Sequence, residues 1–389
     1  AAMNVPAFRD FDAERFLIEH WQKRPLLIRN PWRSWRNPLP PEELAGLACE
    51  GEVESRLVHK TASGELDLEH GPLSPTRFGE LGRYPWTLLV QAVDHHVPAV
   101  AALLDAFRFI PNWRVDDVMV SYAVDGGGVG AHFDRYDVFL VQGLGRRRWR
   151  IGPQCDEATP LQPYDDLRLL AEFEPTAEWV LEPGDILYVP PGFAHEGVAV
   201  GDDCMTYSVG FRAPSRGELL SGWIDHALDT LTDDDRYTDP DLSMQDNPGE
   251  ISSAALDRVY KMMTRSLSDR PAFARWFGEY ATAPKTDRLD WAPEGAVSMQ
   301  DVRSAMESGA TIMRNPASRF AFVRHESGSV TLFVDGVAQE CAGAAADFAE
   351  RLCAEPTIVP GTDMAACQSV VNLIHELIHR GGVAFSEDD

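Results

Sequence analysis

Two histidines and one aspartate are the residues of this chain whose types and spacing could hold a catalytic metal. His132 and Asp134 are two residues apart, which places both side chains on one face if the segment is a strand. His195 follows a Pro-Gly corner and would supply a second imidazole. Two histidines and one carboxylate leave coordination positions open, as in non-haem Fe(II) oxygenases, whereas structural zinc takes four closed ligands. The spacing therefore predicts an Fe(II) site, although an H-x-D pair alone is expected about once by chance.

Arg147 could bind an anionic cosubstrate. The basic run at residues 146–151 alternates between two faces, and Arg147 shares its face with Trp149 and Ile151. An inward guanidinium needs an anionic partner, because an unpaired interior charge is very costly. A dicarboxylate such as 2-oxoglutarate would supply that partner while its 2-oxo acid end chelates iron and dioxygen takes the last position. The alternative is a structural arginine paired with an internal Asp or Glu.

A substrate pocket is predicted beside the metal. Asp117, Met119 and Ser121 share one face of an expected strand, and an acid beside a flexible apolar side chain could hold a guanidinium and its methylene stem. Tyr136 follows the metal-binding pair and could pack on the same stem, and Ser208 is a further candidate. These residues predict recognition of an arginine by Asp117. Ordinary barrel packing is the alternative for each of them.

The elements that must position these residues differ along the chain. Residues 114–214 carry short β-branched and aromatic runs broken by Gly and Pro, which is typical of an antiparallel barrel or jelly roll. A glycine run, Asp125 to Gly130, precedes the metal pair and predicts a tight pocket entrance. Residues 1–115 carry mixed signals with three helical patterns and predict an N-terminal helical extension packed on the next segment. The C-terminal part predicts helices that could mediate self-association, followed by a small winged-helix-like α+β module.

The expected elements have the following bounds. Helical periodicity covers residues 12–20, 41–47, 97–107, 218–231, 252–267, 299–308, 344–353 and 365–380. Strand patterns cover residues 118–124, 138–141, 186–189, 320–323 and 330–334.

Five ordered motifs carry a family resemblance. They are EHWQKRP from Glu19 to Pro25, GGGVGAHFDRYDVF, QGLGRRRWR, LEPGDILYVPPGFAHEG and YSVGFRAP. Together they resemble the JmjC hydroxylases and, more closely, the bacterial ribosomal oxygenases that hydroxylate an arginine of ribosomal protein L-sixteen. The resemblance covers most of the chain and is strongest between Arg114 and Pro214.

The resemblance implies an architecture in three parts. Residues 1–213 would form a mainly β catalytic domain, a double-stranded β-helix of the JmjC and cupin type with an N-terminal helical extension. Residues 214–285 would form an α-helical dimerisation segment, which implies a homodimer. Residues 286–389 would form a winged-helix-like α+β domain.

The resemblance also implies an activity. His132, Asp134 and His195 would be the iron ligands, Arg147 would bind 2-oxoglutarate, and Ser121 could be the assisting hydroxyl. Oxidative decarboxylation of 2-oxoglutarate with dioxygen would yield succinate and carbon dioxide, coupled to hydroxylation at Cβ of the target arginine in ribosomal protein L-sixteen.

Other functions remain open at this stage. A cupin-type isomerase or binding protein would use the same barrel and metal without oxidation, and an inward Arg147 argues against it. A JmjC histidine hydroxylase or demethylase would share the metal site, and only the acid at Asp117 favours arginine. A non-enzymatic ribosome-associated scaffold would not need a complete triad. A zinc peptidase is suggested by His375-Glu-Leu-Ile-His379, but no His or Cys follows it and its apolar neighbours predict an ordinary, partly buried helix.

The composition bears on partners and location. The chain has 35 Lys and Arg against 61 Asp and Glu, a net charge of -26, which argues against direct nucleic-acid binding and favours a cationic partner. A salt-adapted surface would give the same bias. From Thr286 onward 7 Lys and Arg stand against 16 Asp and Glu, a difference of -9, so the C-terminal module is not expected to bind nucleic acid. No apolar stretch is long enough to cross a membrane and no secretory signal is visible, so a cytoplasmic location is expected.

Overall fold

The computed structural model describes residues 8–285 and 291–386. These residues form two compact units. The first contains residues 8–213 and Asn315–Ala317, and the second contains Pro214–Lys285, residues 291–314 and residues 318–386. None of the described helices is long and apolar enough to cross a membrane.

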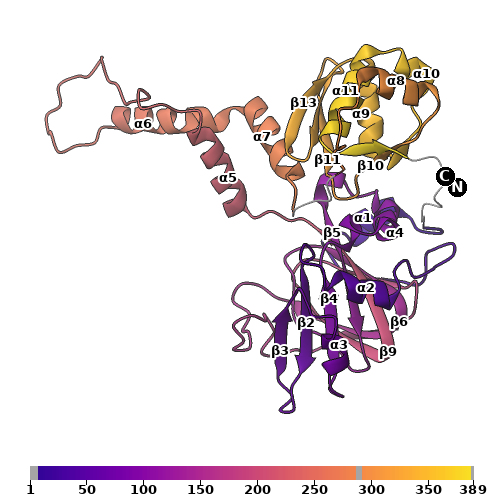
Figure 1. Ribbon diagram of the computed structural model, residues 1–389. Coiled ribbons are helices and arrows are strands. Elements are labelled where there is room, and N and C mark those ends of the chain that lie inside the picture. The colour runs from indigo at the N-terminus through magenta and orange to yellow at the C-terminus, as the bar shows by residue number, and fades with distance from the viewer. Residues whose placement is uncertain (1–7, 286–290, 387–389) are drawn as a thin grey trace. The chain divides into compact units, whose positions relative to one another are not determined.

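A nine-stranded antiparallel sheet forms the body of the first unit (Figure 1). The strand order is β1-β8-β6-β9-β5-β4-β2-β3, and β7 pairs with β6. The strands are β1 (Leu26–Ile28), β2 (Ser55–Lys60), β3 (Leu66–His70), β4 (Trp86–Val90), β5 (Val115–Ala123), β6 (Val138–Gln154), β7 (Ala177–Leu181), β8 (Ile186–Val189) and β9 (Phe193–Phe211). The long strands β6 and β9 pair along most of their length, with register shifts that curve the sheet.

Short helices accompany this sheet. They are α1 (Ala13–Glu19), α2 (Pro41–Leu47), α3 (Arg77–Glu80), α4 (Pro98–Ala101) and the 3₁₀ turns η1 (Val93–His95), η2 (Ala102–Phe107) and η3 (Asn112–Arg114). Asp12 caps α1 by accepting the Arg15 amide at 3.0 Å, which explains where that helix begins. The region before residue 115 also contributes strands that the sequence patterns did not predict, because β1 to β4 belong to the sheet.

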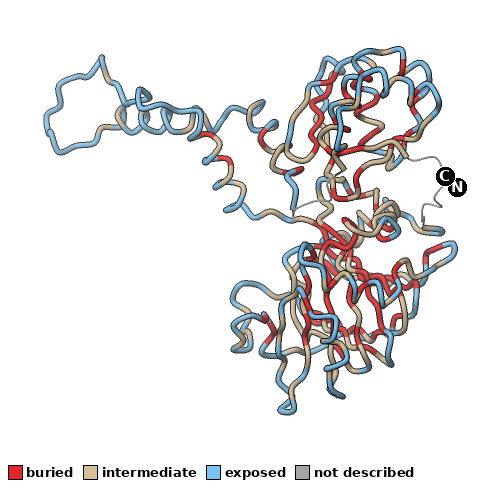
Figure 2. Tube along the Cα trace, in the orientation of Figure 1, coloured by how far each residue is buried: buried red, intermediate tan, exposed pale blue. Residues whose placement is uncertain are grey.

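The two faces of the sheet differ in what they bury. One face packs against the N-terminal elements in the largest core, to which Phe16, Leu88 and Val120 belong. The other face encloses a smaller apolar cluster that includes Leu140 and Trp149, together with several buried polar residues. Figure 2 shows this buried interior running along the strands of the first unit. Polar groups buried inside a β-barrel are costly unless they are bonded or serve a ligand.

The second unit combines helices with two three-stranded sheets, β14-β10-β15 and β11-β12-β13. Its helices are α5 (Arg216–Leu228), α6 (Ser253–Arg265), η4 (Ser266–Ser268), α7 (Arg270–Thr282), α8 (Met299–Glu307), α9 (Ala344–Ala354), α10 (Thr362–Ala365) and α11 (Gln368–His379). Its strands are β10 (Ile312–Arg314), β11 (Phe320–Arg324), β12 (Val330–Val334), β13 (Val337–Cys341), β14 (Thr357–Ile358) and β15 (Val383–Phe385). The α8, α9 and α11 helices share one apolar core with these sheets.

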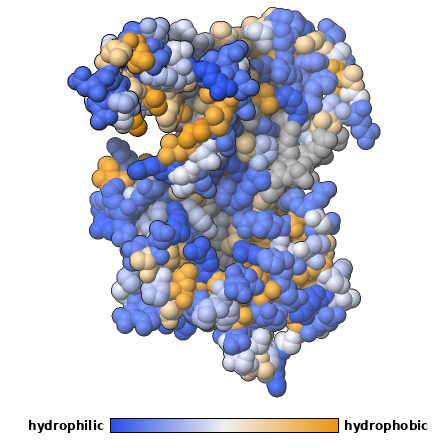
Figure 3. All heavy atoms as spheres, turned by 90° about the vertical axis from the view of Figure 1, so that its left-hand side faces the viewer, coloured by the Kyte–Doolittle hydropathy of each residue, from blue (hydrophilic) through white to orange (hydrophobic). Residues whose placement is uncertain are grey.

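The helices α5 to α7 differ in burial. Trp223 of α5 packs on Trp276 of α7 with ring centroids 5.7 Å apart, and α7 in turn contacts the β11–β13 sheet. By contrast, α6 has no buried residue. In Figure 1, α6 and the acidic loop before it, residues 232–249, project as an arm away from the sheets of the same unit. Figure 3 looks onto this arm, and apolar side chains gather on the surface there.

Candidate active site

His132, Asp134 and His195 converge in the first unit. His132 and Asp134 lie between β5 and β6, and His195 lies near the start of β9. A two-way backbone bridge joins the histidines, with the His132 amide donating to the His195 carbonyl at 3.0 Å and the reverse bond at 2.8 Å. Asp134 Oδ2 lies 3.8 Å from His132 Nε2 and 3.5 Å from His195 Nε2. Among the described residues, this is the group of His, Cys, Asp or Glu whose ligand atoms, all within 4.8 Å of one another, could hold a metal.

Backbone carbonyls fix the orientation of both imidazoles. His132 Nδ1 lies 2.9 Å from the Gly130 carbonyl, and His195 Nδ1 lies 2.9 Å from the Phe193 carbonyl. A carbonyl only accepts, so each Nδ1 donates and each Nε2 is the ring nitrogen that faces Asp134. Burial, aided by His132, lowers the pKa of His195 to about 4, so this ring is neutral near pH 7. Two imidazole nitrogens and one carboxylate suit a divalent metal.

The metal-binding segment is less regular than the sequence suggests. His132 makes a single bridge and Asp134 lies in a loop, so the pair does not occupy the regular strand that we expected. The loop is held in place by the Gly192 amide, which donates to the Asp134 carbonyl at 2.7 Å. The tight corner at Gly192 thus supports the aspartate as well as presenting His195.

The glycine run before His132 has two roles. It lines a hollow of about 340 Å³ together with residues from β2, β3 and the loop at 162–173. It also packs closely on β9, because a Cβ on Gly128 would lie 2.4 Å from the Gly197 carbonyl oxygen. The expected close approach is therefore to a neighbouring strand, and that approach requires glycine.

Arg147 is buried at 3% exposure, and no acidic partner lies beside it among the residues that the structure describes. Among the described residues its guanidinium contacts the Gly197 carbonyl at 3.2 Å and Cys204 Sγ at 3.8 Å, and its Nε has no hydrogen-bond partner. Its carbon Cζ lies 5.2 Å from the Trp149 ring centroid. Burial lowers the pKa of Arg147, although a guanidinium stays protonated in proteins. The interior therefore holds a cation whose natural complement is an anion from outside the chain.

Polar side chains from three strands continue this interior. Ser121 of β5 pairs in register with Thr206 of β9, and Thr206 pairs with Gln142 of β6. The Thr206 hydroxyl donates to Gln142 Oε1 at 3.2 Å, and Gln142 Nε2 reaches Cys204 Sγ at 3.5 Å. Our sequence reasoning missed Thr206, Gln142 and Cys204. Alternation from Ser208 would have placed Thr206 on the same face.

The predicted substrate residues lie along the same face. Met119 of β5 pairs in register with Ser208 of β9. Asp117 is buried, and its Oδ2 accepts from Gln91 Nε2 at 2.8 Å and from the Ala92 amide at 3.0 Å. Ala92 has a left-handed φ of 51°, a strained conformation for a residue other than glycine. The Asp117 carboxylate is therefore held in one orientation.

Among the predicted substrate residues, Tyr136 interacts with Asp134 of the candidate metal group. The residue as a whole is 42% exposed. Burial of the phenol, followed by the charge of Asp134 and a hydrogen bond to it, raises the pKa of Tyr136. The phenol consequently stays protonated and donates toward Asp134.

A second buried network anchors the start of β6. Asp137, which has no exposed surface, accepts from the Tyr188 hydroxyl at 2.5 Å and from Gln22 Nε2 at 2.9 Å. Arg114 Nη2 lies 3.6 Å from the same carboxylate. Gln22 follows α1, so the EHWQKRP motif contributes a residue that fixes the chain three positions after Asp134.

The H-E-x-x-H histidines in the second unit have structural partners. His375 Nε2 bonds the Val297 carbonyl at 2.8 Å, and the Val297 amide donates to His379 Nε2 at 3.3 Å. Glu376 accepts from Gln339 at 2.8 Å. No third ligand joins these histidines within the described part of the chain. They tie α11 to the segment before α8.

Comparisons with known proteins agree on one family. A JmjC domain model matches residues 102–219 and a ROXA-like winged helix model matches residues 265–383. The ribosomal protein uL16 3-hydroxylase of Escherichia coli is 42% identical over 300 residues, covering 77% of this chain and 79% of the relative. A probable ribosomal oxygenase of Haemophilus influenzae is 40% identical over 315 residues, covering 77% of this chain and 76% of the relative.

Solved structures extend the likeness to the whole fold. The Escherichia coli ribosomal oxygenase YcfD in complex with cobalt and 2-oxoglutarate superposes with a TM-score of 0.86 at 34% identity, over 98% of this chain and 100% of that chain. The predicted β catalytic domain, helical segment and C-terminal winged helix are thereby confirmed. This chain belongs to the family of JmjC-domain ribosomal oxygenases.

Proposed function

We propose that this protein is an Fe(II)- and 2-oxoglutarate-dependent oxygenase that hydroxylates Cβ of an arginine in ribosomal protein uL16. The observation that carries the proposal is a buried arginine, without a carboxylate partner in the described part of the chain, in the same interior as a group of two histidines and one aspartate. The 42% identity to a uL16 3-hydroxylase supports the substrate. An isomerase or binding protein of the cupin type would have no use for the unpaired cation.

The residues fit the absent groups. His132, Asp134 and His195 would hold the iron through two Nε2 atoms and a carboxylate oxygen. Arg147 would bind the far carboxylate of 2-oxoglutarate, with Ser121 or its register neighbour Thr206 adding a hydroxyl. Iron, 2-oxoglutarate and dioxygen together supply the oxidising power when bound. The chain's own task is to orient the cosubstrate and present one carbon of the substrate.

The substrate side follows from the same face of the sheet. Asp117 would accept the target guanidinium, Met119 and Tyr136 would pack on its stem, and Ser208 would add a hydrogen bond. The bonds from Gln91 and Ala92 hold the Asp117 carboxylate in one orientation. Undiminished hydroxylation by an Asp117→Ala variant would remove this assignment.

The apolar side of the α5 and α6 arm supports a homodimer. Leu256, Tyr260 and Met263 are 56%, 69% and 67% exposed and recur at helical spacing on α6. An amphipathic helix without a buried residue is not expected to be stable alone in water. We assign residues 214–285 to dimerisation, residues 1–213 to catalysis and residues 286–389 to the winged helix. The proposed substrate would place the enzyme in the cytoplasm.

The test uses the purified protein with Fe(II), 2-oxoglutarate and the uL16 fragment that contains the target arginine. Mass spectrometry should show one added oxygen atom on an arginine, with stoichiometric succinate. His132→Ala is the blank and should lose activity by more than about 100-fold. His379→Ala removes a histidine of the other pair and should keep the activity. Oxygen on a histidine, or loss of a methyl group from a methylated substrate, would indicate the alternative activities of the superfamily.

A further inference from the structure

Arg56 lies at the outer end of a row of residues that pair across the sheet and continue to Ser121 and Thr206. In register, Arg56 of β2 pairs with Leu89 of β4, Leu89 pairs with Ser121 of β5, and Ser121 pairs with Thr206. The row is buried at Leu89, Ser121 and Thr206, with exposures of 7%, 5% and 2%, and becomes half-buried at Arg56. Because paired residues of adjacent strands project to the same side, Arg56 faces the side that carries the proposed substrate residues.

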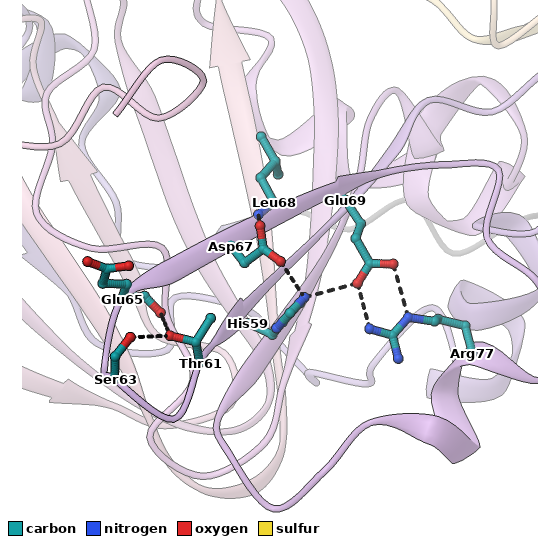
Figure 4. Close-up of polar contacts among 8 residues, drawn as sticks. All are labelled: His59, Thr61, Ser63, Glu65, Asp67, Leu68, Glu69 and Arg77. Atoms are coloured by element: carbon teal, nitrogen blue, oxygen red, sulfur yellow. Dashed lines mark hydrogen bonds and ion pairs between the residues drawn. The ribbon is translucent and has the colours of Figure 1, made fainter. Parts of the chain in front are cut away.

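The charges on the other side of the same hairpin are paired, as Figure 4 shows. Arg77 donates to Glu69 through Nε at 3.0 Å and through Nη2 at 2.6 Å, and His59 Nε2 lies 3.0 Å from Glu69 and 3.5 Å from Asp67. His59 and Glu69 share the side of Leu57, which belongs to the large core. The charged side chains of this cluster therefore pair with one another, and the cluster faces away from the proposed pocket.

Arg56 has no such partner. Within the described part of the chain it forms no ion pair, and the contact of its guanidinium is Nη2 to Met119 Sδ at 3.9 Å. A thioether sulfur is a weak acceptor, so this contact leaves a charged donor group available. Met119 is a residue proposed to touch the target arginine, which brings the free donors of Arg56 to the edge of that arginine's binding place.

We propose that Arg56 binds an oxygen acceptor of the substrate beside the target arginine, either a carboxylate side chain or a main-chain carbonyl. The inference rests on the proposed function and adds a second recognition point to it. Asp117 complements the positive charge of the target side chain, and Arg56 complements a negative or carbonyl group on the flanking chain. Two opposite charges at the pocket would fix the direction in which the peptide lies as well as the residue that enters.

The experiment compares wild-type protein with Arg56→Gln and Arg56→Lys, using the uL16 fragment as substrate. Arg56→Gln should raise KM for the fragment by about 10-fold, the loss of one charge-assisted hydrogen bond, with kcat and the KM for 2-oxoglutarate unchanged. Arg56→Lys should recover part of the loss. Arg77→Gln is the matched control, since it breaks an ion pair on the opposite side of the same hairpin and should leave KM for the fragment unaltered.

An alanine scan of the residues that flank the target arginine identifies the acceptor. If the acceptor is a carboxylate side chain, replacing that one residue by alanine should raise KM with wild-type protein and leave KM unchanged with Arg56→Gln. A carbonyl acceptor appears as an equal loss across all peptides with Arg56→Gln. An unchanged KM in folded Arg56→Gln, with an active wild type, overturns this inference alone. A wild type that leaves the fragment unmodified overturns the proposed function and this inference with it.

Discussion

Arg147 carries the strongest chemical argument at the scale of single residues. Its side chain is buried, yet the described residues around it offer a carbonyl and a thiol instead of a carboxylate. A structural arginine in that position would be expected to have an acidic partner, because breaking a buried pair costs about 3–5 kcal/mol. The sequence left both interpretations open, and the contacts favour the cosubstrate.

Replacement of Arg147 by methionine separates the two interpretations. Without 2-oxoglutarate, the unfolding free energy of Arg147→Met should be higher than that of wild type or at most about 1 kcal/mol lower. The substitution removes an uncompensated charge and loses one hydrogen bond. With a redox-inert divalent metal and 2-oxoglutarate at about 100 times its Kd, the unfolding free energy of wild type should rise by about 2.7 kcal/mol. That of the variant should not change. Thermal unfolding measures both. A variant several kcal/mol less stable without cosubstrate would make Arg147 a structural residue.

At the scale of elements, the loop between β5 and β6 must hold two of the proposed metal ligands without the support of a regular strand. Asp137 anchors its end by joining Gln22, Tyr188 and Arg114. Burial raises the pKa of Asp137 above its ordinary value of 3.8, although its hydrogen bonds oppose the shift. The folded protein consequently binds the proton of the Asp137 carboxyl group more tightly than the unfolded chain does.

The sign of that shift predicts a pH dependence. The stabilising contribution of Asp137 is full below its unfolded pKa of 3.8 and is lost as the pH rises through the higher folded pKa. An asparagine side chain cannot ionise, so the unfolding free energy of wild type minus that of Asp137→Asn should fall as the pH rises from about 4 to 7. Denaturant unfolding of the metal-free protein measures it. Asp241→Asn is the control, because the pKa of Asp241 is lowered by its own backbone amide and by Arg258, so its contribution changes mainly below about pH 4 and should stay nearly constant over the same range. A difference that grows with pH would contradict the prediction.

Local patterns predicted some elements well and others not at all. Helices with clear periodicity, such as α1 and α2, begin and end within a residue or so of the expected bounds. The strands β2 to β4 were missed because their pairing depends on partners far along the chain. α7 was missed because Pro271 and Gly278 interrupt its pattern, and Gly278 is required there since a Cβ would lie 2.3 Å from the Phe333 ring.

The same division applies to the candidate site. The H-x-D motif and His195 indicated the metal group, although the strand alternation expected for His132 and Asp134 is absent. The inward direction of Arg147 follows from alternation along β6, which is a local property of the sequence. Gln91 and Arg56 could not be found in that way, because each acquires its importance from a strand that lies beside it only in the folded sheet. Long-range strand register is the information that a single sequence lacks.

The α6 helix offers a test of assembly at the same scale. Leu256→Glu would place a charge on the exposed apolar side and should convert a dimer to a monomer, since a buried unpaired carboxylate is costly. Light scattering across a concentration series measures the change. Lys261→Ala alters an exposed polar position of the same helix and should leave the dimer intact. Wild-type protein that is monomeric throughout the series would contradict the assignment.

At the scale of the whole molecule, the net charge of -26 is the dominant property. It belongs to a chain whose proposed target side chain is a cation, so long-range attraction should raise the rate of productive encounter. A salt-adapted surface would carry the same charge without affecting substrate binding. The two explanations differ in how turnover responds to ionic strength.

Raising the salt concentration from about 0.01 M to about 0.3 M shortens the screening length from roughly 30 Å to below 10 Å. If the acidic surface guides the substrate, KM for the uL16 fragment should rise several-fold over this range while kcat stays constant, because the bound complex is unaffected once formed. Sucrose at equal osmolality should leave KM unchanged and serves as the control. A flat KM would show that the charge acts on solubility alone, and a falling kcat would show that salt disturbs the site itself.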